Sequence, residues 1–270
     1  MKRGRQTQGF TIVEVLIFLA VSGALLLSAL FFISGTQGKT QFNQAANDVL
    51  QQVNAVVNNV ANGYYAGNDD VTCSIVAGKP VATNGGGSQD RGTAKDCVFL
   101  GRVLSFDSED SFKIYDVVGK RTDGAGADIV DISDASPALI SGTEQTISYR
   151  NGLRFRVTPA GASLKDIDSQ NLKAVAFLST LGKRSTVAGH ADDLETKAQQ
   201  TDFLGINGDV ATVLGSLTQT SYDANVNKAI KLCLDSGDAT GQRAIITIGN
   251  ENGRAGASTS MVIDIGECNL

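Results

Sequence analysis

The most constraining feature of the sequence is a run of 19 residues without a charged side chain, from Val15 to Ile33. As an α-helix this run would be about 28 Å long, close to the hydrocarbon thickness of a bilayer. Lys2, Arg3 and Arg5 precede it, and basic residues beside such a run usually stay in the cytoplasm. We therefore expect one membrane-spanning helix, with the rest of the chain outside the cytoplasm.

A carboxylate stands at the edge of this run, at Glu14. A charged side chain at the centre of a bilayer costs about 2.5–3.5 kcal/mol on insertion scales, so we expect a compensating partner. A secretory signal peptide fits the run less well. Its apolar region has roughly 7–15 residues and a small-residue cleavage site follows, whereas this run is longer.

Residues 9 to 14 read GFTIVE. In order and spacing they resemble the N-terminus of the type IV pilin superfamily, which includes the secretion pseudopilins. The resemblance implies a leader of residues 1–9, cut between Gly9 and Phe10 by prepilin peptidase, and N-methylation of Phe10. It further implies that Glu14 pairs, in an assembled filament, with the Phe10 amine of a neighbouring subunit. A pair of that kind in an apolar core would set the register of assembly.

An amphipathic pattern continues the apolar run. Residues 10–62 are predicted to form one helix about 80 Å long, with Gly63 as its C-cap. We expect it to span the membrane at about 13–34 and to be amphipathic at 35–63, where its apolar stripe packs on a sheet. The stripe consists of Phe42, Ala46, Val49, Val53, Val56 and Val60.

Residues 64–270 read as strands and loops, with two short helices at Ala191–Gln200 and Ala224–Lys231. The sequence thus predicts an α+β fold, in which the long N-terminal helix packs on an antiparallel β-sheet head. Residues 120–225 match no recognisable pattern and are interpreted as an insertion. The predicted strands are Val71–Val76, Cys97–Phe106, Phe112–Val118, Thr146–Arg150, Leu153–Thr158, Ala174–Thr180, Arg243–Gly249 and Ser258–Ile265.

Two stretches of the head carry a second resemblance. They read CVFLGRVLSFDSEDSFKIYDVVG, at residues 97–119, and KLCLDSGDATGQRAIITIGNENGRAGASTSMVIDIGEC, at residues 231–268. Both are similar to the heads of H-type minor pseudopilins and FimT-like minor pilins.

The four cysteines are dispersed, at Cys73, Cys97, Cys233 and Cys268. Their spacing does not suggest a zinc site, and an even number behind a membrane segment favours disulfides in an oxidising compartment. Three connectivities are open. We favour Cys73–Cys97 with Cys233–Cys268, since these are nearest in sequence, each adding roughly 3–4 kcal/mol in the loop-entropy description. Free buried thiols are the alternative.

Asn151-Gly152 lies between two predicted strands and is typical of a two-residue hairpin turn. Such a turn would put Tyr149, Arg154 and Arg156 on one face of the ribbon, where they could contact nucleic acid. FimT-like pilins are associated with DNA uptake. A solvated outer face is the alternative, and the net charge of −5 argues against broad phosphate binding.

The sequence offers little for catalysis, cofactors or metals, and we expect none of them. The one histidine, His190, is accompanied by no motif for a serine nucleophile. Two acidic clusters could bind calcium, but neither has the order of an EF-hand loop, so solvated loops are favoured. These clusters are Asp107, Glu109 and Asp110, and Asp123, Asp128 and Asp131.

The resemblance favours a minor pilin or pseudopilin, a non-enzymatic subunit of a type IV pilus-like or type II secretion filament. Its implied partners are other pilin or pseudopilin subunits, prepilin peptidase, an inner-membrane assembly platform and the cytoplasmic membrane, with DNA an open candidate. It would be a single-pass membrane protein before assembly and part of an extracytoplasmic filament afterwards. The alternative is a non-polymerising, membrane-anchored extracellular binding protein or hydrolase, which would retain residues 1–9.

Overall fold

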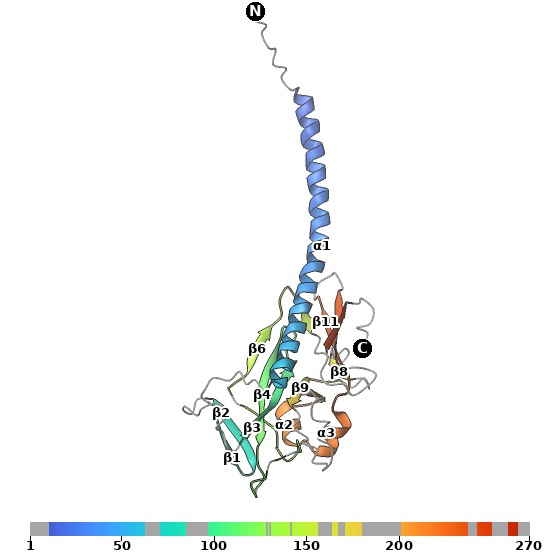
Figure 1. The fold of residues 1–270 in the computed structure, drawn as a ribbon. Coiled ribbons are helices and arrows are strands. Elements are labelled where there is room, and N and C mark those ends of the chain that lie inside the picture. The colour runs from blue at the N-terminus through green and yellow to red at the C-terminus, as the bar shows by residue number, and fades with distance from the viewer. Residues whose placement is uncertain are drawn as a thin grey trace, which may run out of the picture.

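The fold combines a long helix with antiparallel sheets in a computed structural model, which confirms the predicted α+β class (Figure 1). The structure describes eleven parts of the chain. These are residues 11–62, 71–84, 97–127, 129, 131–140, 142–155, 164–166, 171–179, 201–236, 242–249 and 259–263.

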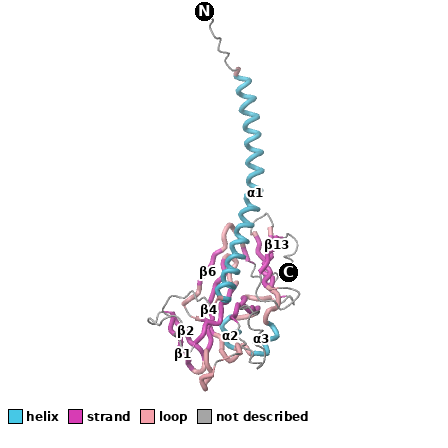
Figure 2. Tube along the Cα trace, in the orientation of Figure 1, coloured by secondary structure: helices cyan, strands magenta, loops and turns pink. Residues whose placement is uncertain are grey.

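Helix α1 runs without a break from Ile12 to Ala61 and confirms the predicted long helix. No proline interrupts these 50 residues, so every turn can keep its backbone hydrogen bonds. Asn62 is the C-cap of the helix, and its backbone N–H donates to the carbonyl of Asn58 at 3.0 Å. The predicted C-cap, Gly63, lies outside the described residues. The first half of α1 extends away from the head, and its second half lies against the strands (Figures 1 and 2).

All pairings among the described strands are antiparallel. In chain order the strands and the two short helices are β1 Val71–Val76, β2 Lys79–Asn84, β3 Cys97–Ser105, β4 Ser111–Lys120, β5 Ala138–Leu139, β6 Gln145–Ser148, β7 Arg154–Phe155, β8 Leu164–Asp166, β9 Ala174–Ser179, β10 Thr201–Ile206, α2 Val210–Gly215, α3 Gln219–Asn225, β11 Ile230–Asp235, β12 Arg243–Ile248 and β13 Thr259–Ile263.

Three sheets make up the described head. The main sheet has the order β10-β9-β3-β4-β5, and β6 also pairs with β4. The second sheet has the order β13-β12-β11-β7, and β8 also pairs with β11. The hairpin β1–β2 forms a small third sheet, which contacts β4 and β5 through β2.

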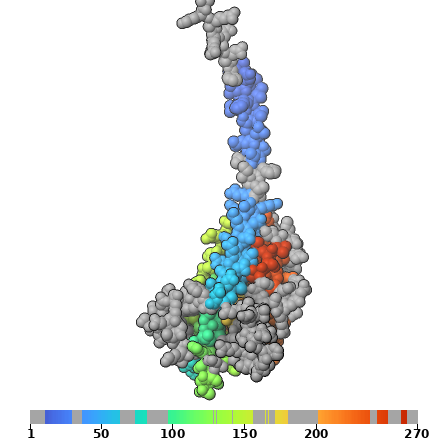
Figure 3. Space-filling model, viewed as in Figure 1, coloured from blue at the N-terminus to red at the C-terminus, as the bar shows by residue number. Residues whose placement is uncertain are grey.

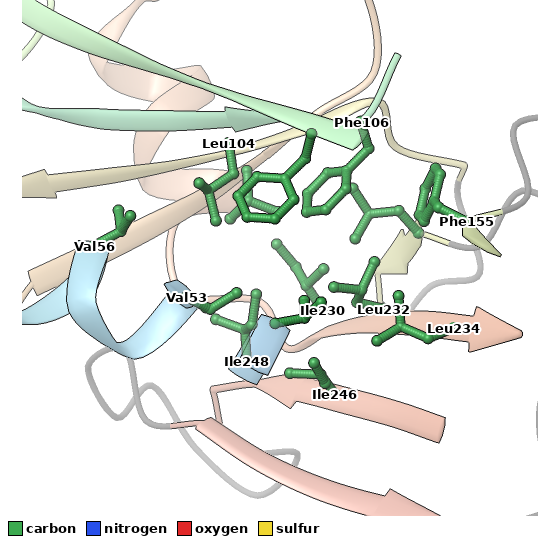
Figure 4. Packing of buried hydrophobic residues seen from close by; sticks show 14 of the residues in the cluster. Val53, Val56, Leu104, Phe106, Phe155, Ile230, Leu232, Leu234, Ile246 and Ile248 are labelled. Atoms are coloured by element: carbon green, nitrogen blue, oxygen red, sulfur yellow. The ribbon is translucent and has the colours of Figure 1, made fainter. Parts of the chain in front are cut away.

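The main core, here called the inner core, lies where the main sheet, the second sheet and the second half of α1 meet. All six stripe residues predicted on α1 are buried in it, together with Ala45 and Val57. Figure 4 shows Val53 and Val56 beside side chains from both sheets. The other residues labelled there are Leu104, Phe106, Phe155, Ile230, Leu232, Leu234, Ile246 and Ile248.

A second hydrophobic cluster covers the opposite face of the main sheet. Alternate residues of β9 and β10 point to it, among them Ala176 and Leu204, and it is closed by Leu214 of α2 and Tyr222 of α3. The main sheet is therefore covered on both faces, which explains why its central strands are buried nearly throughout.

Residues 120–225, interpreted as an insertion, supply an inner strand of the main sheet. Strand β9 pairs with β3 on one side and with β10 on the other. A segment that fills an inner position of a sheet cannot be removed without opening the core. Sequence patterning missed β10, as it missed β2 and the very short β5 and β8.

The predicted helix at Ala224–Lys231 is also wrong. Helix α3 ends at Asn225, and Asn227 takes a left-handed backbone conformation with φ 57°, which an α-helix cannot continue. Strand β11 follows from Ile230, where buried Ile230, Leu232 and Leu234 recur at every second position. The other predicted short helix, Ala191–Gln200, lies outside the described residues.

The remaining predicted strands are confirmed where they are described, with small shifts at their ends. Strand β7 covers only the first residues of the predicted Leu153–Thr158, and residues 156–158 lie outside the description. Strand β13 lies within the predicted strand Ser258–Ile265. Ser258 and residues 264–265, on either side of it, lie outside the description.

A buried ion pair crosses the centre of the main sheet. Arg102 of β3 and Asp116 of β4 are direct register partners, and the Nε of Arg102 lies 2.7 Å from Oδ1 of Asp116. Both side chains are at most 5% exposed. Burial raises the pKa of Asp116 above its ordinary 3.8, while the charge and hydrogen bond of Arg102 oppose that rise.

We expect Arg102→Met to lower the free energy of unfolding by about 3–5 kcal/mol near neutral pH, because it leaves a buried carboxylate without its cation. A carboxyl with a higher pKa in the folded state binds more protons there than in the unfolded state. The contribution of Asp116 to the free energy of unfolding therefore rises as the pH falls towards 3.8, and the destabilisation caused by Arg102→Met should shrink. Urea titrations of the full chain in detergent micelles at several pH values measure this.

The matched control is the double variant Arg102→Met/Asp116→Leu, which removes both charges and should recover most of the lost stability. A single variant as stable as the unaltered chain at neutral pH would show that the pair contributes nothing.

Candidate assembly site at the N-terminal helix

The first half of α1 is an exposed apolar surface. Residues Ile12–Ala29 have a mean hydropathy of 2.4, and none of this segment is buried within the molecule. Its large side chains are between 45% exposed, at Val15, and 81% exposed, at Ile12. Figure 3 shows this segment in blue, standing clear of the head. An 18-residue helix of this composition is long and apolar enough to cross a membrane, and it is consistent with a single anchor or a signal.

Glu14 takes part in a capping box at the start of this helix. Thr11 is the N-cap, and its side-chain oxygen accepts a hydrogen bond from the backbone N–H of Glu14 at 3.3 Å. In return, Oε2 of Glu14 accepts hydrogen bonds from the backbone N–H of Thr11 at 3.2 Å and from its hydroxyl at 3.3 Å. Oε1 of Glu14 has no hydrogen-bond donor among the described residues.

The capping box explains how one chain can tolerate Glu14 at the edge of an apolar segment. Two donors satisfy one oxygen of the carboxylate, and the unpaired N–H groups of the first turn carry partial positive charge towards it. The other oxygen is left to accept a donor from outside the helix. The charge of Glu14 is thus partly compensated within its own helix, while Oε1 can still accept a hydrogen bond.

Sequence reasoning identified Glu14 but missed its partner, Thr11. The signal was present, because Thr-x-x-Glu before an apolar run is the pattern of a capping box. Gly9 and Phe10, the predicted sites of cleavage and N-methylation, lie outside the described residues.

Polar contacts fix the second half of α1 to both sheets. Nδ2 of Asn151 donates to the carbonyl of Gln41 at 3.3 Å, and the hydroxyl of Thr201 donates to the carbonyl of Val57 at 3.4 Å. The hydroxyl of Thr259 in β13 also bonds to Oδ1 of Asn54. These contacts join the second half of α1 to the head, and the exposed first half continues from it in the same helix.

The prediction that Tyr149, Arg154 and Arg156 share one face of a two-stranded ribbon is wrong, because the strands on either side of the turn do not pair with each other. Asn151 and Gly152 do form the tight turn, with φ of 54° and 72°, and Leu153 N–H donates to the carbonyl of Arg150 at 3.1 Å. The strands beside the turn nevertheless separate, since β6 joins the main sheet and β7 the second sheet.

Tyr149 consequently packs inward, against the inner core, with its ring centre 5.9 Å from that of Phe112. Arg154 is exposed and pairs in register with Asp235 of β11. Arg156 lies outside the described residues. Without the aromatic side chain, stacking of bases on this face has no support, and an individual contact from Arg154 stays a prediction.

Cys97 and Cys233 each take part in a disulfide bond, and none of the described cysteines is free. The side chain of Cys73 and the whole of Cys268 lie outside the described part of the chain. The pairing of Cys73 with Cys97 and of Cys233 with Cys268 therefore stays a prediction.

No group of three or more His, Cys, Asp or Glu side chains in the described residues is placed to hold a metal ion. Asp123 instead closes its own turn, because its Oδ1 accepts from the N–H groups of Ala125 and Ala127 at 2.8 and 2.9 Å. These hydrogen bonds lower the pKa of Asp123. His190 and Asp128 lie outside the description.

Comparison of the chain with known protein families, with curated proteins and with solved structures finds no match.

We expect Thr11→Ala to fray the first turn of α1 at a cost of about 1 kcal/mol, because the N-cap oxygen is lost. The matched control is Glu14→Gln, since a glutamine at this position can keep the reciprocal hydrogen bond without the charge. Hydrogen exchange of the amides of residues 12–15 in micelles measures the difference. Equal exchange rates in Thr11→Ala and the unaltered chain would contradict the role of the cap.

Proposed function

We propose that this protein is a minor pilin or pseudopilin, a non-enzymatic subunit of a type IV pilus-like or type II secretion filament. The observation that carries the proposal is the two-part use of one helix. Its exposed apolar half, at Ile12–Ala29, can leave a membrane and pack with other such helices, while its second half belongs to the core of the head. The GFTIVE motif ends in the sequence at Glu14, which lies in the first turn of that helix.

The assembly step would use the carboxylate of Glu14. In the membrane the capping box compensates part of its charge. In a bundle of such helices, where the dielectric constant is low, a cationic amine on a neighbouring chain would be attracted to the same carboxylate. Prepilin peptidase would create that amine by cutting between Gly9 and Phe10. The free Oε1 would accept the new partner without loss of the cap.

The second candidate is a membrane-anchored extracellular binding protein or hydrolase that does not polymerise. The exposed apolar helix alone would serve this candidate too, because one such helix is sufficient for anchoring, whereas the GFTIVE motif favours the first candidate. The two candidates differ at the N-terminus, since a plain anchor has no need to lose residues 1–9.

Mass spectrometry of the protein isolated from its native membrane should show a chain beginning at Phe10, with a methyl group on its amine. The physical reason is that the cut supplies the positive charge that Glu14 requires in a bundle. A Gly9→Val variant, in which the leader's last residue is bulkier, serves as the control and should keep residues 1–9. A mature chain that retains those residues in the unaltered protein favours the second candidate.

Glu14→Gln should reduce incorporation into filaments at least tenfold, while the amount inserted in the membrane stays unchanged. This substitution removes the charge and preserves the capping hydrogen bonds, so it separates the ion pair from helix stability. Thr11→Ala, which keeps the charge and removes the cap, should assemble better than Glu14→Gln. Quantitative immunoblots of sheared filaments and of membranes measure both, and normal assembly of Glu14→Gln would exclude the proposed pairing.

A further inference from the structure

The second half of α1 keeps one face outside the head. Gln37, Gln44, Gln51 and Asn58 recur at every seventh position, and all four are exposed. They lie on the opposite side of the helix from the buried stripe that contains Val53. Figure 3 shows this part of α1 in lighter blue, uncovered along the head. We call these four residues the amide line, because each side chain ends in a carboxamide.

The exposed face of this half is almost without charge. Residues 40–62 contain ten asparagines and glutamines but one charged residue, Asp48, although 19% of the whole chain is charged. Asp48 has a cation nearby in its own chain, since Nη1 of Arg150 lies 3.9 Å from its Oδ2. Contact of this face with a partner would therefore avoid most of the cost of removing charges from water.

The amide line is complementary to a copy of itself. Each carboxamide carries donors and an acceptor, so two identical faces can hydrogen-bond where two faces of like charges would repel. A seven-residue repeat is the spacing at which two helices stay in contact along a left-handed supercoil. Polar residues in such a seam also set its register, because an amide that is out of register loses its partner. The partner that fits is a parallel copy of α1.

The same repeat continues into the apolar half of the helix. Leu16 and Gly23 stand on the seven-residue line of Gln37, and both are exposed. Helix α1 is unbroken from Ile12 to Ala61, so its two halves turn the same side towards a neighbour. Two copies in one membrane, in the same orientation, would bring both segments into contact at once. Their heads would lie on the outer sides of the pair, since each head packs on the opposite face of its helix.

From this pattern we infer that the amide line pairs with the amide line of a second copy of the chain, side by side in the membrane and in register. The inference rests on the membrane anchor, which both candidate functions share, and not on the cut after Gly9 or on the Glu14 pair. A partner with a charged surface would find no opposite charge on this line. The second half of α1 thus gains a contact that the proposed site at its N-terminus does not include.

The test measures energy transfer between donor- and acceptor-labelled copies of the full, uncut chain in lipid vesicles, at several ratios of protein to lipid. Prepilin peptidase is absent, so the result is independent of filament assembly. We expect saturable transfer in the unaltered chain. The variant Gln44→Lys/Gln51→Lys should associate about tenfold more weakly, because like charges then face each other. Transfer that reflects only random proximity in the bilayer, or unchanged association of this variant, would overturn the inference.

Mixed populations test the register. Copies with Gln44→Lys/Gln51→Lys and copies with Gln44→Glu/Gln51→Glu should associate with each other as strongly as the unaltered chain, because opposite charges then meet. A mixture of Gln44→Lys with Gln51→Glu should recover less, since the two positions are about 10 Å apart along a helix. Thr220→Lys adds the same charge at an exposed position of α3 and should leave association unchanged. No recovery in the first mixture, or an equal loss in Thr220→Lys, would overturn the inference.

Discussion

Burial of one stripe of α1 between two sheets is the interaction on which the rest of the fold depends. Phe42, Val49, Val53 and Val60 are at most 4% exposed, and the side chains around them come from the main and the second sheet. Each sheet would otherwise expose an apolar face. At roughly 25 cal/mol for each Å² of apolar surface removed from water, burial of such a stripe contributes strongly to folding. The helix is therefore the central element of the head as well as its stem.

Charge is handled in two different ways along the chain. Arg102 and Asp116 are both taken out of water and face each other across β3 and β4, so each is the condition for burying the other. Glu14 is exposed, and the groups that satisfy it are local, in the first turn of its own helix. The first arrangement is complete within the chain, whereas the second leaves one carboxylate oxygen without a donor in the described residues.

The sequence predicted the elements whose pattern is local and failed where tertiary contacts decide. Helical periodicity identified every stripe position from Phe42 to Val60, because a 3.6-residue repeat leaves few other readings. Strand β10 was not predicted, since it pairs with β9, which precedes it by more than twenty residues. The Asn151-Gly152 turn was predicted correctly, yet its flanking strands belong to different sheets. No local signal indicates that choice, because β6 pairs with β4 and β7 pairs with β11, which are both distant in the sequence. Thr11 alone could have been found from spacing.

The separation of strands at Asn151-Gly152 has a mechanical consequence. The chain passes from one sheet to the other within a single tight turn, and Asn151 at that turn also holds the carbonyl of Gln41 on α1. Tension applied along the stem would thus reach both sheets at once, through side-chain packing and through the covalent backbone. Neither sheet can slide off the helix alone. A molecule built this way should resist pulling as one cooperative unit, giving a single rupture event instead of stepwise extension.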